Sequence, residues 1–158
     1  MHSDNTLLAN GRAMVADWGH DERTILLSLS PMSHHIGTVA TEQMMAAGLE
    51  LVVNAPPPGR TALDWILETG ATYVMGVPTH AMDILAELRR RRLDRLGAVK
   101  LLYMAGSPIP REIAQSFLDI GVLPQNVYGM TESGSHQYTL PSDDPRTIVE
   151  TCGRACRA

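Results

Sequence analysis

The sequence predicts an α/β fold in which a parallel sheet of about five strands carries helices on both faces. Short apolar runs alternate with longer segments whose apolar residues recur at helical spacing. The apolar runs are continuous and aliphatic, which is typical of strands buried on both faces. Glycine or proline stands near many of the junctions. Repeated strand–helix–strand units of this kind form right-handed crossovers.

The first three elements are predicted from the spacing of apolar residues and from the glycine and proline residues at their ends. A helix is predicted over residues 3–17, where apolar residues recur at helical spacing behind the candidate cap Ser3. An aliphatic strand is predicted over 24–30, immediately before a proline. The next helix is predicted over 36–47 and is closed by Gly48.

The middle elements repeat this order. A second apolar strand is predicted over 49–53, before the prolines at 56–58. A short helix is predicted over 61–68 because Thr61 can cap its first turn. A third strand is predicted over 72–76, where small and apolar residues follow a glycine.

The last predicted elements are two helices and two strands. Helices are predicted over 78–91 and 110–120, and each opens on a proline, which suits the first helical turn. Strands are predicted over 99–104 and, as a short piece, over 126–128. After Leu140 the chain turns polar, and no further element is predicted.

Length and charge narrow the class of protein. The chain has 158 residues, which suits one domain, and 44% of them are hydrophobic, enough for a core. The net charge of −4 argues against a nucleic-acid-binding protein, which would usually be basic. The arginine run 89–92 is interpreted as a solvated helix end whose charges suit the helix dipole, in preference to a phosphate site.

The cysteines and the apolar runs indicate the cellular compartment in which the protein is expected. Cys152 and Cys156 are interpreted as free thiols, because two cysteines supply neither a disulfide framework nor a zinc site. No signal-peptide pattern opens the chain, and no apolar run approaches the roughly 20 residues that cross a bilayer. A cytoplasmic protein without a membrane span is therefore expected, and homo-oligomerisation is left open.

Unusual residues follow three of the predicted strands, in the segments 31–35, 105–108 and 129–132. Parallel sheets bind ligands at the carboxyl ends of their strands, so these segments are expected to form one site. In Tyr128-Gly129-Met130-Thr131-Glu132, the ring can stack on a base and the glycine allows close approach. Thr131 can donate to a phosphate oxygen, and Glu132 can bind magnesium. A strand end with a polar turn is the alternative.

These segments together resemble the adenylate-forming superfamily, which includes acyl-CoA synthetases, adenylation domains of peptide synthetases and luciferases. The resemblance covers almost the whole chain, and its motifs stand in the family's order. The matching segments are His2–Asn5, Pro31–His34, Gly76–Thr79, Ala105–Ile109, Tyr128–Glu132 and Cys152–Arg154. The clearest match is Tyr128–Glu132 with the pattern Tyr-Gly-x-Thr-Glu. The main departures are Ala105 and Ser107, where the family carries glycine and alanine.

The resemblance implies a reaction of a carboxylic acid with ATP and Mg2+ that gives an acyl-adenylate, followed by transfer of the acyl group to coenzyme A. It implies catalytic roles for His34, Thr131 and Glu132, with Glu132 also the metal ligand. Nucleotide contacts are implied for Ala105, Gly106, Ser107, Tyr128, Gly129, Met130 and Thr131. An acyl pocket is implied near His35, Ile36, Gly37, Met104, Ser133 and Gly134. A capping or packing role is the alternative for each histidine.

Substrate and acceptor are less constrained. Ser33 stands where many relatives carry an aromatic residue, which suggests room for a fatty or alicyclic acid. The segment 31–37 is most similar to medium-chain and cyclohexanecarboxylate CoA ligases. An adenylation domain with another acceptor is the first alternative, although the only nearby acidic residue, Glu42, lies in a predicted helix. A non-enzymatic nucleotide-binding remnant is the second.

Several parts of the family pattern do not occur in residues 1–158. The glycine-rich phosphate loop, the ribose-binding aspartate, and the small C-terminal domain with its lysine have no counterpart here. The chain is therefore expected to be one partial AMP-binding domain that does not catalyse adenylation alone. We expect no pyrophosphate release above background from ATP, octanoate and coenzyme A. Measurable acid-dependent release would contradict this expectation.

Overall fold

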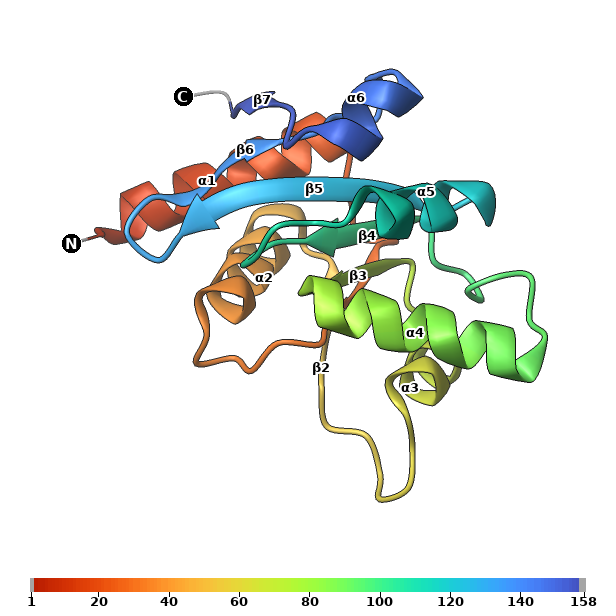
Figure 1. The fold of residues 1–158 in the computed structure, drawn as a ribbon. Coiled ribbons are helices and arrows are strands. Elements are labelled where there is room, and N and C mark those ends of the chain that lie inside the picture. The colour runs from red at the N-terminus through yellow and green to blue at the C-terminus, as the bar shows by residue number, and fades with distance from the viewer. Residues whose placement is uncertain (1, 157–158) are drawn as a thin grey trace.

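A computed structural model describes residues 2–156 and contains one seven-stranded sheet with helices on both faces (Figure 1). The helices are α1 (Asp4–Trp18), α2 (His35–Ala47), α3 (Ala62–Thr69), α4 (Pro78–Arg91), α5 (Arg111–Asp119) and α6 (Pro145–Glu150). The strands are β1 (Ile25–Ser28), β2 (Glu50–Val53), β3 (Tyr73–Gly76), β4 (Leu101–Met104), β5 (Leu123–Met130), β6 (Gly134–Tyr138) and β7 (Arg154–Ala155). The predicted α/β class is confirmed.

The sheet is parallel over its first five strands and antiparallel at one edge. Its order is β2-β1-β3-β4-β5-β6-β7, and β1 to β5 pair in parallel. The strands β6 and β7 then add as antiparallel partners. The prediction of a parallel sheet was therefore right for β1 to β5 and missed the antiparallel edge.

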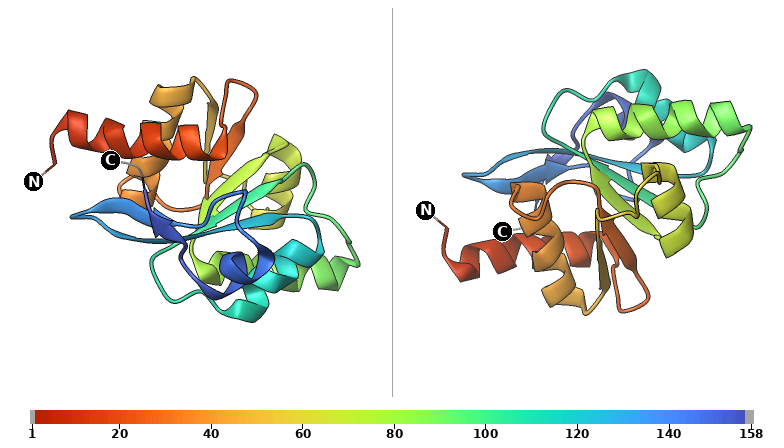
Figure 2. Two further views of the ribbon diagram at one scale, coloured as in Figure 1. Left: turned by 90° about the horizontal axis from the view of Figure 1, so that it is seen from above. Right: turned by 90° about the horizontal axis from the view of Figure 1, so that it is seen from below.

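The sheet separates two cores, and Figure 2 shows α1 and α2 on one side of it with α4 and α5 on the other. One core joins α3, α4 and α5 to side chains such as Leu102 and Met104. The other core joins α1 and α2 to Leu101 and Tyr103. Successive residues of β4 thus point to opposite faces, as the strand pleat requires.

Besides the unpredicted β6, two segments of the chain differ from the predicted elements. The short strand predicted over 126–128 is part of the longer β5, whose first half includes the buried polar residues Gln125 and Asn126. The polar segment after Leu140 contains α6 and β7. The helix α6 forms because Asp144 caps it: the Asp144 side chain accepts hydrogen bonds from the backbone N–H groups of Arg146 and Thr147.

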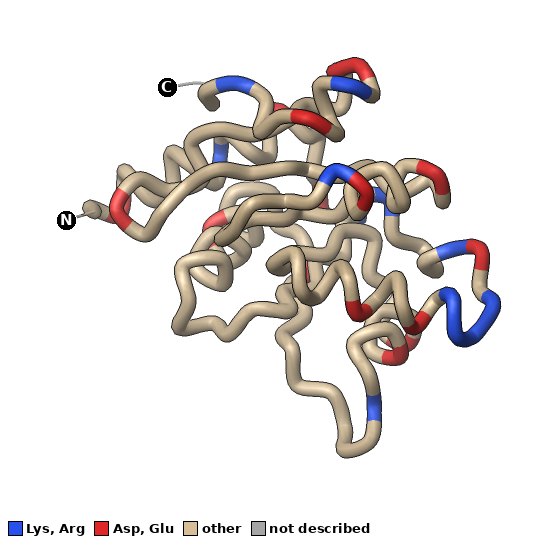
Figure 3. Tube along the Cα trace, in the orientation of Figure 1, with Lys and Arg blue, Asp and Glu red and all other residues tan. Residues whose placement is uncertain are grey.

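The arginine run ends α4, as predicted, and Figure 3 shows its positive charge beside acidic residues. Arg91 lies 2.6 Å from Asp64 and 2.5 Å from Glu87, and Arg90 lies 2.6 Å from Glu87. Two of these ion pairs lie within α4, and the pair of Arg91 with Asp64 joins α4 to α3. Among the helices of residues 2–156, none combines the length and the apolar character needed to cross a membrane.

Candidate functional site

A cavity of about 210 Å³ lies where β4 and β5 end and α2 begins. Its lining comes from three chain segments that follow different strands. The lining residues are His34, His35, Ile36, Tyr103, Ala105, Gly106, Gly129, Met130, Thr131, Glu132, Gly134 and Ser135. The structure thus brings the three predicted segments together at the carboxyl edge of the parallel strands, the usual ligand edge of such sheets.

Some predicted site residues do not line this cavity. Met104 is buried in the core on the opposite face of the sheet, and its neighbour Tyr103 lines the cavity instead. Gly37 packs beneath the preceding turn, where an added Cβ would lie 2.6 Å from the carbonyl oxygen of Pro31. The others outside the lining are Ser107, Tyr128 and Ser133, all of them exposed.

The Tyr-Gly-Met-Thr-Glu segment forms the end of a strand and the turn of a hairpin, whereas the sequence predicts that residues 129–132 follow the strand. Tyr128, Gly129 and Met130 are the last residues of β5, and the turn that follows is closed by the Ser133 N–H donating to the Met130 carbonyl at 3.1 Å. Gly134 then has a φ of 74°, in the left-handed region that glycine adopts readily. The turn presents the side chains of residues 131–133 to solvent at the cavity rim.

The hairpin is fastened to α1. The Asn10 side chain donates to the Ser135 carbonyl and accepts from the Ser135 N–H, both at 3.0 Å. His2 Nε2 lies 2.7 Å from the Thr131 carbonyl oxygen. Figure 1 shows the hairpin turn and the start of α1 at the same end of the molecule. The sequence offered no signal for Asn10, because its partner lies 125 residues away.

His34 caps the helix that points at the cavity. The Ile36 N–H donates to His34 Nδ1 at 3.2 Å, so the neutral ring that makes this cap carries its proton on Nε2. The capping alternative for His34 is therefore realised. The amino end of α2, at His35 and Ile36, lines the cavity and provides a partial positive charge that favours anions.

His35, the first residue of α2, also lines the cavity. Its Nε2 is buried and has no hydrogen-bond partner in the described part of the chain. Its ring stacks near that of His2, with centroids 6.4 Å apart and an angle of 14° between the planes. Burial lowers the pKa of His35, the neighbouring His2 and His34 lower it further, and Glu132 opposes the shift. His35 is therefore expected to be neutral near physiological pH.

Two buried hydroxyl groups line the cavity, and the sequence missed both. The Tyr103 and Ser135 hydroxyl oxygens lie 2.9 Å apart, so one donates to the other. Burial raises the pKa of Tyr103 to about 12; its bond to Ser135 opposes the rise, and Glu42 adds to it. Glu42 itself is only 2% exposed, and burial raises its pKa to about 7.

Tyr128 and Glu132 stand at the rim. The Tyr128 side chain is 48% exposed and meets His136 edge-on, with centroids 5.1 Å apart. Glu132 is exposed at the turn and lines the cavity. No cluster of three metal-ligating residues occurs among residues 2–156. A lone accessible carboxylate beside an anion-binding helix end still suits Mg2+, which usually keeps several waters and shares its ligands with substrate phosphates.

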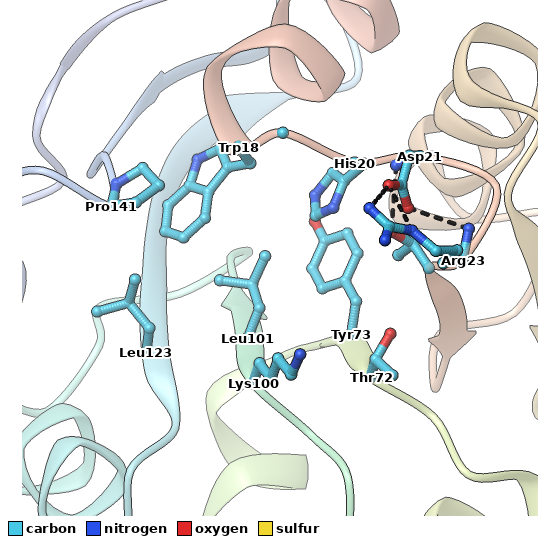
Figure 4. Close-up of a pocket in the computed structure, with 12 residues that line it drawn as sticks. Trp18, His20, Asp21, Arg23, Thr72, Tyr73, Lys100, Leu101, Leu123 and Pro141 are labelled. Carbon is cyan, nitrogen blue, oxygen red and sulfur yellow. Dashed lines mark hydrogen bonds and ion pairs between the residues drawn. The ribbon is translucent and has the colours of Figure 1, made fainter.

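A second cavity, of about 470 Å³, lies at the opposite, amino edge of the sheet (Figure 4). Its wall includes Trp18, Leu101 and a stacked pair, His20 and Tyr73, whose ring centroids are 4.6 Å apart. Burial lowers the pKa of His20 to about 4, and neighbouring Asp21 only partly offsets this. None of the predicted site residues lies here.

Comparison with known proteins identifies the family. The sequence profile of the AMP-binding enzymes matches residues 1–158. The chain belongs to the AMP-binding enzyme family. The feruloyl-CoA synthase of Amycolatopsis sp is 32% identical over 88% of this chain and 27% of its own length. The medium-chain fatty-acid–CoA ligase of Escherichia coli is 24% identical over 98% of the chain, again 27% of its own length.

Several solved structures share the fold. The Mycobacterium tuberculosis fatty acyl CoA synthetase superposes with a TM-score of 0.84 at 18% identity, covering 98% of this chain and 31% of the other. Apo MatB from Rhodopseudomonas palustris gives 0.82 at 23% identity, covering 99% and 30%. The chain thus spans less than a third of the length of each of these relatives and solved structures.

Proposed function

We propose that this chain is the central part of an AMP-forming acid–CoA ligase. The whole protein would join a carboxylic acid to ATP as an acyl-adenylate and then transfer the acyl group to coenzyme A. The observation that carries the proposal is that His34, Thr131 and Glu132 line one cavity together with the amino end of α2. Membership of the AMP-binding enzymes supports it, as do relatives named as CoA ligases and CoA synthases.

Each residue at the cavity has a role that suits its chemical group. The substrate carboxylate and the α-phosphate are both anionic, and the amino end of α2 and the Thr131 hydroxyl supply the donors that hold them. Nε2–H of His34 can donate to the same oxygens, because Nδ1 is occupied by the cap. Glu132 would hold Mg2+, which neutralises charge on the phosphates when bound. Tyr128 would stack on adenine, and the backbone at 105–107 would border the base.

The structure says little about which carboxylic acid is the substrate or in which cellular compartment the protein acts. Ser33 is exposed and does not line the cavity, so its small size does not support a fatty or alicyclic acid. The relatives act, by name, on ferulate in one case and on medium-chain fatty acids in another. We propose a cytoplasmic location by analogy with the Escherichia coli relative, whereas a relative from Mus musculus is a mitochondrial acyl-CoA ligase.

Tyr128→Ala tests the nucleotide half of the site. We expect the wild-type chain to bind an acyl-sulfamoyladenosine, a stable mimic of the acyl-adenylate, in isothermal titration calorimetry. Removing the ring loses one base–aromatic contact, so Tyr128→Ala should weaken binding by about tenfold. Tyr128→Phe keeps the ring and should bind like the wild type. Equal binding by the alanine variant would contradict the assignment of Tyr128, and no binding by the wild type would contradict the proposed site.

A further inference from the structure

Helix α1 runs beside β6 and is joined to it by side-chain hydrogen bonds at both ends of the strand (Figure 1). Near the hairpin turn, the Asn10 side chain bonds the N–H and the carbonyl group of Ser135, each at 3.0 Å. At the other end of β6, the Tyr138 hydroxyl donates to Asp17 at 2.9 Å. The contact of Asn10 lies beside the candidate site, because Ser135 lines the cavity, whereas neither Asp17 nor Tyr138 does.

The pairing of β6 with its neighbouring strands is interrupted near the turn. Tyr128 of β5 pairs with Gln137 but Gly129 pairs with Ser135, so the β6 residue between them bulges out of the ladder. On the other side of β6, β7 pairs with residues further from the turn. The Asn10 carboxamide offers Ser135 one donor and one acceptor, as the backbone of a neighbouring strand would. Asn10 therefore supports the hairpin at the point where the ladder is disrupted.

Two further contacts with α1 fix the backbone of the turn. His2 Nε2 donates to the Thr131 carbonyl oxygen at 2.7 Å, because a carbonyl oxygen can only accept. Asn10 also packs against Gly134, where an added Cβ would lie 3.0 Å from the Asn10 Oδ1 atom. The turn backbone is thus in contact with α1 or its amino end on both sides of Glu132.

The side chains of Thr131 and Glu132 depend on this backbone for their position. Among residues 2–156, no hydrogen bond or ion pair holds either side chain to the rest of the protein. Both side chains line the cavity, so where they stand relative to a nucleotide is set by the turn that carries them. Because a misplacement of about 1 Å can cost about a hundredfold in rate, the support of this turn matters for the reaction.

We propose that Asn10 is a positioning residue of the site, which holds the turn that presents Thr131 and Glu132 to the phosphates through its two bonds to Ser135. Asn10 itself does not line the cavity, so it acts through the hairpin and not by touching the ligand. This inference rests on the proposed function, which gives Thr131 and Glu132 their roles at the nucleotide.

The test compares Asn10 with the other bond between α1 and β6. Binding of the acyl-sulfamoyladenosine without Mg2+ is measured by calorimetry, and urea unfolding of each variant measures its stability. Asn10→Ala should weaken binding by about tenfold, the equivalent of one well-placed hydrogen bond. The matched control Tyr138→Phe removes the bond at the far end of β6 and should bind like the wild type, although it also loses stability. Equal weakening by Tyr138→Phe would overturn the role of Asn10, because docking of α1 as a whole would then set the affinity.

A double variant shows whether Asn10 acts through the turn. Thr131→Val removes the hydroxyl that is proposed to contact the phosphate, and it should also weaken binding by about tenfold. If Asn10 acts by placing this hydroxyl, the double variant should bind about as weakly as Thr131→Val alone. A loss of about a hundredfold, the product of the two single effects, would mean that the residues act independently and would overturn the positioning role. Full affinity in Thr131→Val would overturn it as well.

The remaining outcomes separate this inference from the proposed function. Asn10→Asp is a milder second variant, because it keeps the size and the acceptor of asparagine and lacks the donor to the Ser135 carbonyl. It should weaken binding several-fold. Wild-type affinity in either Asn10 variant, with a fold shown by circular dichroism, would overturn the positioning role and leave the ligase proposal standing. Failure of the wild type to bind the mimic would overturn both.

Discussion

Glu42→Gln is expected to stabilise the folded chain at about pH 8 and to change its stability little at about pH 5. Burial raises the pKa of Glu42 from an ordinary 4.5 to about 7. Between these values the folded state binds the proton more tightly than the unfolded state, so the free energy of unfolding falls as pH rises through this window. Glutamine has no charge to bury, so the variant avoids that loss.

The expected gain at the higher pH is roughly 3 kcal/mol, the free-energy equivalent of that pKa difference. Urea unfolding of the wild type and the variant at both pH values measures it. His20 titrates with the opposite sign, since its pKa of about 4 in the folded state means that stability falls as pH drops below its ordinary 6.5. That contribution is common to both proteins and cancels. If Glu42→Gln raised the free energy of unfolding by the same amount at both pH values, the raised pKa of Glu42 would be contradicted.

The sequence could predict that the three segments meet, because that inference needs only the order and the direction of the strands. Segments that follow parallel strands reach the same edge, so placing His34, Gly106 and Glu132 together required no long-range information. The hairpin was missed because Gln125 and Asn126 interrupt the apolar pattern of β5. They are tolerated there because Gln125 bonds the Tyr73 hydroxyl and Asn126 donates to α6, and these distant partners leave no local signal.

The interior of the site could not be predicted for a related reason. Tyr103 and Met104 are adjacent apolar residues of one strand, and only the placement of α2 decides which of them faces the cavity. Glu42 was recognised only as an acidic residue in a helix. Gly11 of α1 lets the two helices approach closely at this point, because an added Cβ there would lie 2.7 Å from the Glu42 Cβ.

Gly129→Ala is expected to disrupt the hairpin that carries the nucleotide residues. A Cβ at position 129 would lie 2.1 Å from the Gly134 carbonyl oxygen and 3.0 Å from the Ser135 Cα, both rigid backbone atoms across the β5–β6 pair. The strands would have to separate, so we expect a loss of about 3 kcal/mol in the free energy of unfolding, at the upper end for overpacking. Urea unfolding measures this loss.

The same substitution should abolish binding of the acyl-sulfamoyladenosine, because Tyr128 lies in β5 next to Gly129 and Thr131 lies in the turn that joins β5 to β6. The matched control is Gly121→Ala. Gly121 has a φ of 78° and nothing within 4 Å of an added Cβ, so alanine there adds only backbone strain, about 1–2 kcal/mol, far from the cavity. If Gly129→Ala is no more destabilising than this control and still binds the mimic, then close packing of the hairpin does not position Tyr128 and Thr131. Faster hydrogen exchange confined to β5 and β6 would place the damage in the hairpin and not in the parallel sheet.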